Sequence, residues 1–335
     1  MTAEKIWLCL SGGNALGAYH AGVYQALHEQ GIAPDRIASA SIGAITGALI
    51  AGNPPDQRVG VLREFWRRAG DDGFTMPGIC SRHQSIVRAL LSGRPKLFQP
   101  KLSAVPALFS YASADFLFDT PPQRRTLIEL IDFDLLNNCE ITFLMTALDA
   151  ESGEDVVFGN GADEMSVNHL MAGTALPIAF PPVQIDGRIL IDPGLSANLP
   201  VHPMFDTELT DEVICICIDL LPREGPLERS LDGMIGRATD LLFASQSRHA
   251  LTDIRRRFAR GGNTNLSIIH LVYRQQDEEV GLKAFDYSRR SINSRWAFGY
   301  ADGLALTKAL QDMPARRTSA DIWALSDDGL LFLQS

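Results

Sequence analysis

The stretch ASASIGAIT, residues 38–46, places Ser41 between the end of an apolar strand and a run of helix-forming residues. The preceding DRIAS predicts a short strand, and the run from Ser41 to Ala51 predicts a helix that ends at GNPP. A sharp strand-to-helix turn with small neighbours holds a serine hydroxyl clear of the chain, as in the nucleophile elbow G-x-S-x-G. An ordinary helix N-cap also places a serine here, so this turn alone supports both interpretations.

A glycine-rich turn, SGGNALG (11–17), lies earlier in the chain between the apolar run KIWLCLS and a segment with helical apolar spacing. Glycines leave backbone amides uncovered, and amides near a helix N-terminus favour negative charge. The turn lacks the Gly-Lys-Ser/Thr of a P-loop, and Asn14 stands where a dinucleotide fingerprint needs glycine. An oxyanion hole and a plain glycine-rich turn remain as interpretations.

A third turn, DPGLSANLP (192–200), follows the short strand RILI. An aspartate at a strand end can orient and deprotonate a serine, which makes Asp192 a candidate general base. An Asx-turn or a helix cap would place an aspartate here as well.

The alternation of apolar strands with amphipathic helices predicts an α/β fold. We expect one domain with a central, mainly parallel sheet flanked by helices, plus a helical insertion. Its predicted parts are a catalytic region at 5–220, an insertion or lid at 73–125, and a C-terminal α/β extension at 221–335 packed on the same domain.

Composition narrows the function class. The chain has 335 residues, 46% of them hydrophobic, and a formal net charge of −10, which argues against a general nucleic-acid binder. The five cysteines form no CxxC pair, and we expect free thiols in a reducing compartment. Neither a signal peptide nor a long apolar span is evident, so we expect a cytoplasmic protein. No metal-ligand spacing appears, and no metal or cofactor is expected.

Taken together, the three turns resemble the motifs of the patatin-like phospholipase family. GGNALG, SASIG and DPG stand where that family has G-G-G-x-R/K-G, G-x-S-x-G and D-G-G/A. The flanking segments are similar too, and the resemblance covers about residues 5–220. The tract DYSRRSINSRWAFGYADG (286–303) resembles a C-terminal extension of some bacterial members.

The resemblance implies a serine acyl-ester hydrolase that uses a Ser–Asp dyad, without a cofactor, on fatty acyl esters of phospholipids or related lipids. Ser41 would be the nucleophile and Asp192 its base, within hydrogen-bond reach of the serine. The implied oxyanion and substrate-binding residues are Gly12, Gly13, Asn14, Gly17, Ile42, Gly43 and Gly194.

Four positions depart from the family pattern. Asn14 replaces a glycine, and asparagine tolerates a positive φ angle better than most residues, so we expect a left-handed backbone there. Leu16 replaces the usual basic residue, which removes a charge near the site. Ser39 replaces the first elbow glycine, and Pro193 replaces a glycine beside Asp192. These departures leave two alternatives open: a catalytically weak relative that binds lipid or a partner, and an esterase acting on hydroxyacid esters.

The stretch 73–114 contains no Asp or Glu although the chain is acidic. Its cations are interleaved with apolar residues, and QSIVRALLSG has helical apolar spacing. Such a segment suits a lid over Ser41 that contacts a membrane surface, but also an insertion whose apolar face packs on the core. Both interpretations leave the cations on the surface, namely Arg82, Arg88, Arg94, Lys96 and Lys101. Of the seven histidines none can be placed beside Ser41 from sequence, and oligomeric state is not predicted.

Overall fold

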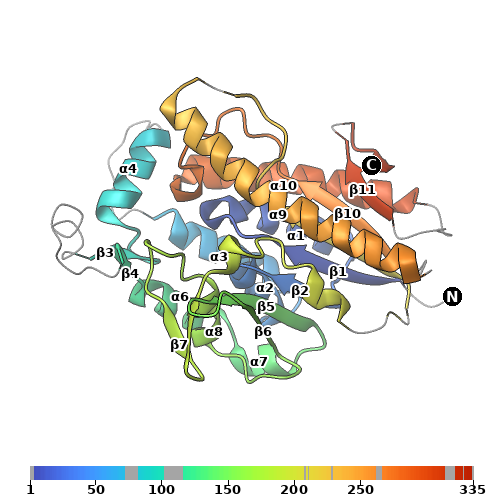
Figure 1. The fold of residues 1–335 in the computed structure, drawn as a ribbon, viewed down its shortest axis with the longest axis horizontal. Helices are drawn as coiled ribbons and strands as arrows, with labels where there is room; N and C mark the ends of the chain where they lie inside the picture. Colours follow the sequence, from blue (N-terminus) through green and yellow to red (C-terminus); the bar gives the residue numbers. More distant parts are fainter. Residues whose placement is uncertain are drawn as a thin grey trace.

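The structure is a computed structural model that describes residues 4–71, 82–101, 116–206, 209, 211–227, 229–261, 266–313, 321–326 and 328–333. A mostly parallel sheet runs through the described residues, with helices on both faces (Figure 1). Its strand order is β12-β11-β10-β9-β1-β2-β5-β8-β7, and β6 pairs with β5 outside this path. The predicted fold class is confirmed.

The described strands and helices have the following bounds. The strands are β1 (Lys5–Leu10), β2 (Arg36–Ser39), β3 (Gln99–Pro100), β4 (Phe118–Asp119), β5 (Thr142–Asp149), β6 (Asp155–Gly159), β7 (Val183–Ile185), β8 (Arg188–Ile191), β9 (Val213–Asp219), β10 (Leu266–Val272), β11 (Asp321–Leu325) and β12 (Leu331–Leu333). The helices are α1 (Ala18–Glu29), α2 (Ile42–Ala51), α3 (Arg58–Ala69), α4 (Arg82–Ser92), α6 (Pro121–Leu130), α7 (Phe133–Asn138), α8 (Val167–Gly173), α9 (Leu231–Gly261) and α10 (Arg289–Gln311). Short 3₁₀ turns are η1 (Asn14–Gly17), η2 (Pro193–Leu195), η3 (His202–Phe205) and η4 (Lys283–Phe285).

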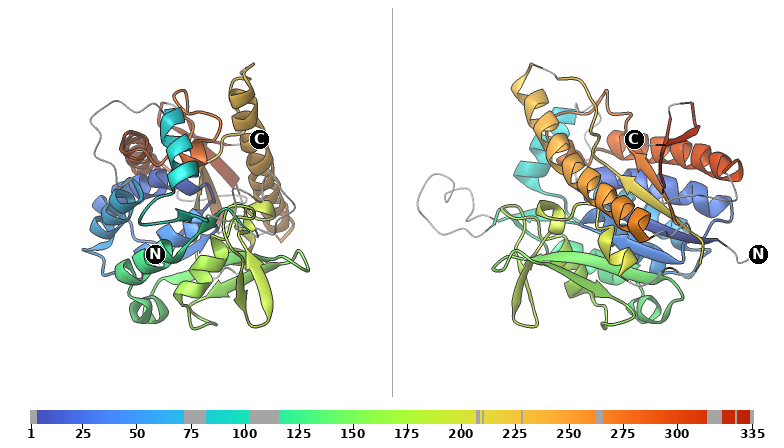
Figure 2. Two further views of the ribbon diagram at one scale, coloured as in Figure 1. Left: turned by 90° about the vertical axis from the view of Figure 1, so that its left-hand side faces the viewer. Right: turned by 45° about the vertical axis from the view of Figure 1, so that its right-hand side comes forward.

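The central strands are buried on both faces, which explains their almost unbroken apolar sequences. In β1, Leu8 and Leu10 belong to one core cluster and Trp7 and Cys9 to a second, because successive side chains point to opposite faces. Helix α9 crosses the second face, whereas α1, α2, α3 and α10 cover the first (Figures 1 and 2). Among the described cysteines, Cys9, Cys139, Cys215 and Cys217 are free, as predicted.

Strand β1 lies between β2 and β9, and the chain continues outward from it in both directions. In open parallel sheets such a switch point opens a crevice at the carboxyl ends of the strands. The first two predicted turns follow β1 and β2 and therefore meet at this edge. Strands β10 and β11, which lie beyond residue 220, extend the same sheet. No helix in the described ranges is both long and apolar enough to span a bilayer.

The insertion is only partly described. The predicted helix within QSIVRALLSG is confirmed as α4, whereas Cys80, Leu108 and Phe109 lie outside the described residues. The expectation that all the cations lie on the surface is wrong for Arg94, which is buried and donates to the Ser85 hydroxyl at 3.1 Å. Arg82 is also largely enclosed, because it pairs with Glu279 at 3.0 Å.

Candidate active site

Ser41 stands at the sharp turn between β2 and α2. Its φ and ψ angles are 53° and −126°, a conformation that non-glycine residues rarely adopt. It occupies the N-cap position of α2, but its hydroxyl makes no capping hydrogen bond. A strained backbone with a hydroxyl that does not cap the helix fits the elbow interpretation and not that of an ordinary N-cap.

The residues around Ser41 explain why one glycine of the elbow is present and the other is absent. A Cβ atom on Gly43 would lie 2.3 Å from the Leu10 carbonyl oxygen, so only glycine lets α2 approach β1 this closely. Ser39 ends β2, and its hydroxyl donates to the Leu144 carbonyl at 2.9 Å. A serine is therefore accommodated at the first elbow position.

Asp192 follows β8, which runs antiparallel to β5 and pairs with the end of that strand. Its side chain is only 2% exposed, and Oδ1 accepts a hydrogen bond from the Gly194 amide at 2.8 Å. The Asx-turn interpretation is thus correct for the backbone, while one carboxylate oxygen remains for other contacts. Pro193 begins η2, a position where a proline needs no amide hydrogen, so this departure is also accommodated.

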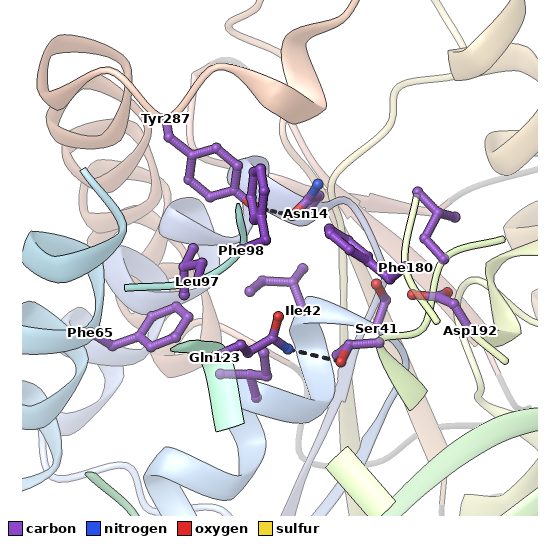
Figure 3. Close-up of a pocket in the computed structure, with 13 residues that line it drawn as sticks. Asn14, Ser41, Ile42, Phe65, Leu97, Phe98, Gln123, Phe180, Asp192 and Tyr287 are labelled. Atoms are coloured by element: carbon purple, nitrogen blue, oxygen red, sulfur yellow. Dashed lines mark hydrogen bonds between the residues drawn. The ribbon is translucent and has the colours of Figure 1, made fainter. Parts of the chain in front are cut away.

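Ser41 and Asp192 line one pocket, and their oxygen atoms face one another (Figure 3). Burial raises the pKa of Asp192 from 3.8 to about 6, although the Ser41 side chain and the Gly194 amide both act to lower it. A carboxylate with this pKa is ionised at neutral pH and is a better proton acceptor than an exposed aspartate. This pairing can deprotonate the serine.

The glycine-rich turn after β1 has the backbone predicted for Asn14, whose φ angle is 52°. The Tyr287 hydroxyl donates to Asn14 Oδ1, and both residues line the pocket. Tyr287 lies just before α10, 273 residues further along the chain. The C-terminal part of the chain therefore contributes directly to this turn.

Not every amide in the predicted oxyanion set is available. The Gly12 amide donates to the Asn198 carbonyl at 2.9 Å, and the Gly43 amide donates to the Ala40 carbonyl at 2.8 Å. The Gly194 amide is engaged by Asp192. These three amides are not free to bind an oxyanion, so their glycines serve the backbone geometry of the site.

Four predicted residues remain, and three of them, Gly13, Asn14 and Ile42, have amides that are candidate donors. They lie at the starts of η1 and α2, where no carbonyl of the same helix can accept them. Gly17 has a packing role, because a Cβ atom there would lie 2.5 Å from Ile42 Cγ1. The candidate donors therefore reduce to two adjacent amides on one turn and one on the other.

A buried arginine lies beside the turn in which Leu16 replaces a basic residue. Leu16 is fully buried, and Arg295 of α10, also fully buried, donates to the neighbouring Ala15 carbonyl at 3.1 Å. The same guanidinium forms a two-pronged pair with Glu279, at 2.8 and 2.7 Å. Leu16 itself carries no charge, but α10 places a guanidinium, paired with Glu279, against this turn.

The rest of the pocket is mostly apolar, and sequence reasoning had not assigned these residues to the site. The additional lining residues are Ile45, Phe65, Leu97, Phe98, Gln123, Thr174, Leu176, Phe180 and Tyr287. Phe98 lies against Phe118, Phe180 and Tyr287, with ring centroids 4.9, 5.4 and 5.9 Å away. The cavity volume is only about 40 Å³, room for a few water molecules but not for an acyl chain.

Histidines do not take part in this arrangement. No histidine lines the pocket among the residues that the structure describes. His20 is fully buried, and burial lowers its pKa to about 4. His169, His202 and His270 contact Ser166, Asp253 and Asp219 respectively. The described site thus offers a serine–aspartate pair and not a triad.

Comparison with known proteins agrees with the motifs. The sequence profile of the family described as patatin-like phospholipase matches residues 8–205, and a profile described as patatin phospholipase matches residues 228–320. The second match covers α9 and α10, which supply Gln246, Arg295 and other contacts around the site.

Individual relatives are distant and longer. An uncharacterised NTE family protein of Mycobacterium tuberculosis is 26% identical over 219 residues, which are 64% of this chain and 30% of that protein. Lysophospholipase NTE1 of Cryptococcus neoformans is 22% identical over 216 residues, 64% of this chain and 11% of that protein. The chain thus spans less than a third of either relative. The crystal structure of VipD from Legionella pneumophila aligns with 90% of this chain and 66% of its own, with a TM-score of 0.43 and 14% identity.

Proposed function

Because the chain belongs to the patatin-like phospholipase family, we propose that it is a serine hydrolase of acyl esters, with Ser41 as nucleophile and Asp192 as general base. The observation that carries the proposal is the contact of these two side chains in one pocket, with Ser41 on a strained turn and Asp192 buried. The strain keeps the hydroxyl exposed to substrate, and the raised pKa of Asp192 suits proton transfer near neutral pH.

In the proposed reaction, Asp192 accepts the Ser41 proton as Oγ attacks the ester carbonyl carbon. The carbonyl π electrons move to oxygen, and the tetrahedral oxyanion rests on the amides of Gly13, Asn14 and Ile42. The intermediate collapses, and the alcohol leaves with the proton that Asp192 returns. A water molecule, deprotonated by Asp192, then attacks the acyl-serine carbonyl; the bond to Ser41 Oγ breaks, Asp192 returns the proton to Oγ, and the fatty acid is released.

The lining of the pocket favours an apolar acyl group as the part of the substrate that binds there. Its walls are mainly aliphatic and aromatic, but its volume is too small for an acyl chain. Substrate entry must therefore displace side chains, and Leu97 and Phe98 from the predicted insertion lie among those that close the space. These contacts favour a cover over the pocket and support the lid proposed for residues 73–125.

Labelling with a fluorophosphonate probe tests the proposal directly. We expect a covalent adduct on Ser41, located by mass spectrometry of the digested protein, and none in Ser41→Ala. Absence of label in the folded wild type would favour the alternative of a catalytically weak lipid- or partner-binding relative. Product analysis with phospholipid, monoacylglycerol and polyhydroxybutyrate then separates a lipid hydrolase from an enzyme that acts on hydroxyacid esters.

Asn14 provides a test of the oxyanion turn. Its φ angle of 52° suits glycine or asparagine, whereas a β-branched residue would be strained there. We expect Asn14→Gly to retain activity on a soluble p-nitrophenyl ester and Asn14→Val to lose about 10- to 100-fold in kcat, with a smaller change in KM. Full activity in the valine variant would show that this turn does not hold the oxyanion.

A further inference from the structure

Helix α9 reverses its amphipathic pattern halfway along its length. In the second half, Leu251, Ile254 and Phe258 are buried against the sheet, as expected for a covering helix. The same buried face continues into the first half with residues that are small or polar. These are Gly236, Asp240, Ala244 and Ser247.

The exposed face of the first half is apolar instead. Leu231 is 80% exposed and Leu242 is 55% exposed. Between them lie Met234, Ile235 and Leu241, all exposed and all at helical spacing on the same side. We call these five residues the α9 stripe. A continuous apolar stripe that faces water indicates an interaction surface, because the helices of globular proteins normally bury their apolar face against the core.

The surroundings of α9 hold the stripe outward. Asp240 on the opposite face forms an ion pair with Lys283 at 2.6 Å, and both side chains are largely buried. Gly236 packs so closely on the backbone of Gly281 that a Cβ atom would lie 3.2 Å from the Gly281 Cα. Rolling the helix to bury the stripe would break this pair and lose this contact, so the exposure is built into the fold.

The end of the stripe lies one helical turn from a contact with the turn that follows Asp192. Gln246, one turn beyond it, donates to the Gly194 carbonyl at 3.2 Å and accepts from the Asn198 amide at 3.1 Å. Other apolar side chains are also exposed, on the loop beside the pocket and on α4. Ile178, between two lining residues, is 75% exposed, and Leu91 of α4 is 73% exposed. Helix α4 and the start of α9 project at the same end of the molecule (Figures 1 and 2).

We propose that the α9 stripe, together with the exposed apolar side chains of α4 and of the loop at Ile178, is a docking surface for an anionic lipid bilayer. The proposal rests on the proposed function, since an acyl-ester substrate would pass from the bilayer into the adjacent pocket. Charge complementarity supports this occupant: Arg88 of α4 and Lys96 are exposed, and residues 82–101 contain no Asp or Glu, in a chain of net charge −10. These apolar side chains lie on separate elements, and a fluid bilayer can contact all of them without a matching rigid shape.

Sedimentation with vesicles of equal parts phosphatidylcholine and phosphatidylglycerol tests the surface. We expect the wild type to bind and Leu231→Gln/Leu242→Gln to lose at least about tenfold in partition coefficient, because both side chains would leave the bilayer interior. Since both are exposed, the variant should keep its melting temperature. The matched control is Leu330→Gln/Leu333→Gln, which removes comparably exposed leucines near β12 and should bind as the wild type does. Binding should also weaken with added salt.

Equal binding by the α9 variant, or no binding by the wild type, would overturn the proposal. A wild type that is dimeric and a variant that is monomeric in size-exclusion chromatography, without vesicle binding, would assign the stripe to a second copy instead. Hydrolysis of a soluble p-nitrophenyl ester separates this surface from the chemistry of Ser41. Vesicle binding without hydrolysis would refute the proposed function alone, and hydrolysis without vesicle binding would refute the docking surface alone.

Discussion

Replacing Ser41 with alanine is expected to lower kcat/KM for p-nitrophenyl butyrate by about 10⁴- to 10⁶-fold, to near the background rate. The proposed reaction has no other nucleophile, because Asp192 is buried and serves as the base, and no histidine lines the pocket in the described structure. The amides at the starts of η1 and α2 would still polarise a bound ester, which accounts for any residual rate above water. Initial rates at several enzyme concentrations measure this loss.

Ser39→Ala is the matched control for this experiment. Ser39 lies two residues before Ser41, and its hydroxyl is engaged by the Leu144 carbonyl and not by the pocket. We expect this variant to keep most of the activity while losing some stability, about 1 kcal/mol for one hydrogen bond. If Ser41→Ala keeps the wild-type kcat/KM, or if both variants lose kcat/KM equally, Ser41 is not the nucleophile.

Local signals in the sequence were sufficient for the fold class and for the meeting of the first two turns, whereas the roles assigned to Asn14 and Ser41 rested on the family resemblance. Each central strand is a short apolar run bounded by glycine or a turn residue, because parallel strands are buried on both faces. The carboxyl ends of parallel strands lie at the same edge of the sheet, which predicts that the turns carrying Asn14 and Ser41 lie close together. Asp192 required the family resemblance, since an Asx-turn explains its position equally well in isolation.

The contacts that complete the pocket were not predictable in this way, because they join residues far apart in the chain. Tyr287 and Arg295 reach the glycine-rich turn from α10 and the segment before it. Nothing at Leu16 indicates that a cation from α10 stands beside it. The availability of each amide was equally hidden, since the partner of Gly12 is the carbonyl of Asn198. The charge of Arg94 predicts exposure, but its hydrogen bond to Ser85 allows burial.

Replacing Asp192 with asparagine is expected to lower kcat by about 10³- to 10⁴-fold while making the folded protein more stable at neutral pH. Asparagine can still accept from the Gly194 amide, so the turn should persist, but it cannot accept the Ser41 proton. Burial holds the pKa of Asp192 at about 6 instead of 3.8, so the ionised form is disfavoured in the fold. At neutral pH this corresponds to about 3 kcal/mol of lost stability at most.

The sign of the pH dependence distinguishes this role from a merely structural one. Because the folded-state pKa is raised, the contribution of Asp192 to stability is present below about pH 4 and is lost as the pH rises through about 6. The stability advantage of Asp192→Asn should therefore grow between pH 4 and 7, as measured by urea unfolding. In the wild type, kcat/KM should rise over the same range, because only the ionised carboxylate accepts the proton.

Asp186→Asn is the control for the loss of a carboxylate. Asp186 lies in the hairpin turn before β8 with a φ angle of 49°, which asparagine tolerates, and it does not line the pocket. We expect this variant to keep the wild-type rate and pH profile. An Asp192→Asn enzyme with near wild-type turnover, or a wild-type kcat/KM that stays flat from pH 4 to 7, would exclude Asp192 as the base. If the wild-type kcat/KM rises from pH 4 to 7, and the stability gain of Asp192→Asn grows over the same range, both effects come from the ionisation of Asp192, the buried carboxylate that faces Ser41.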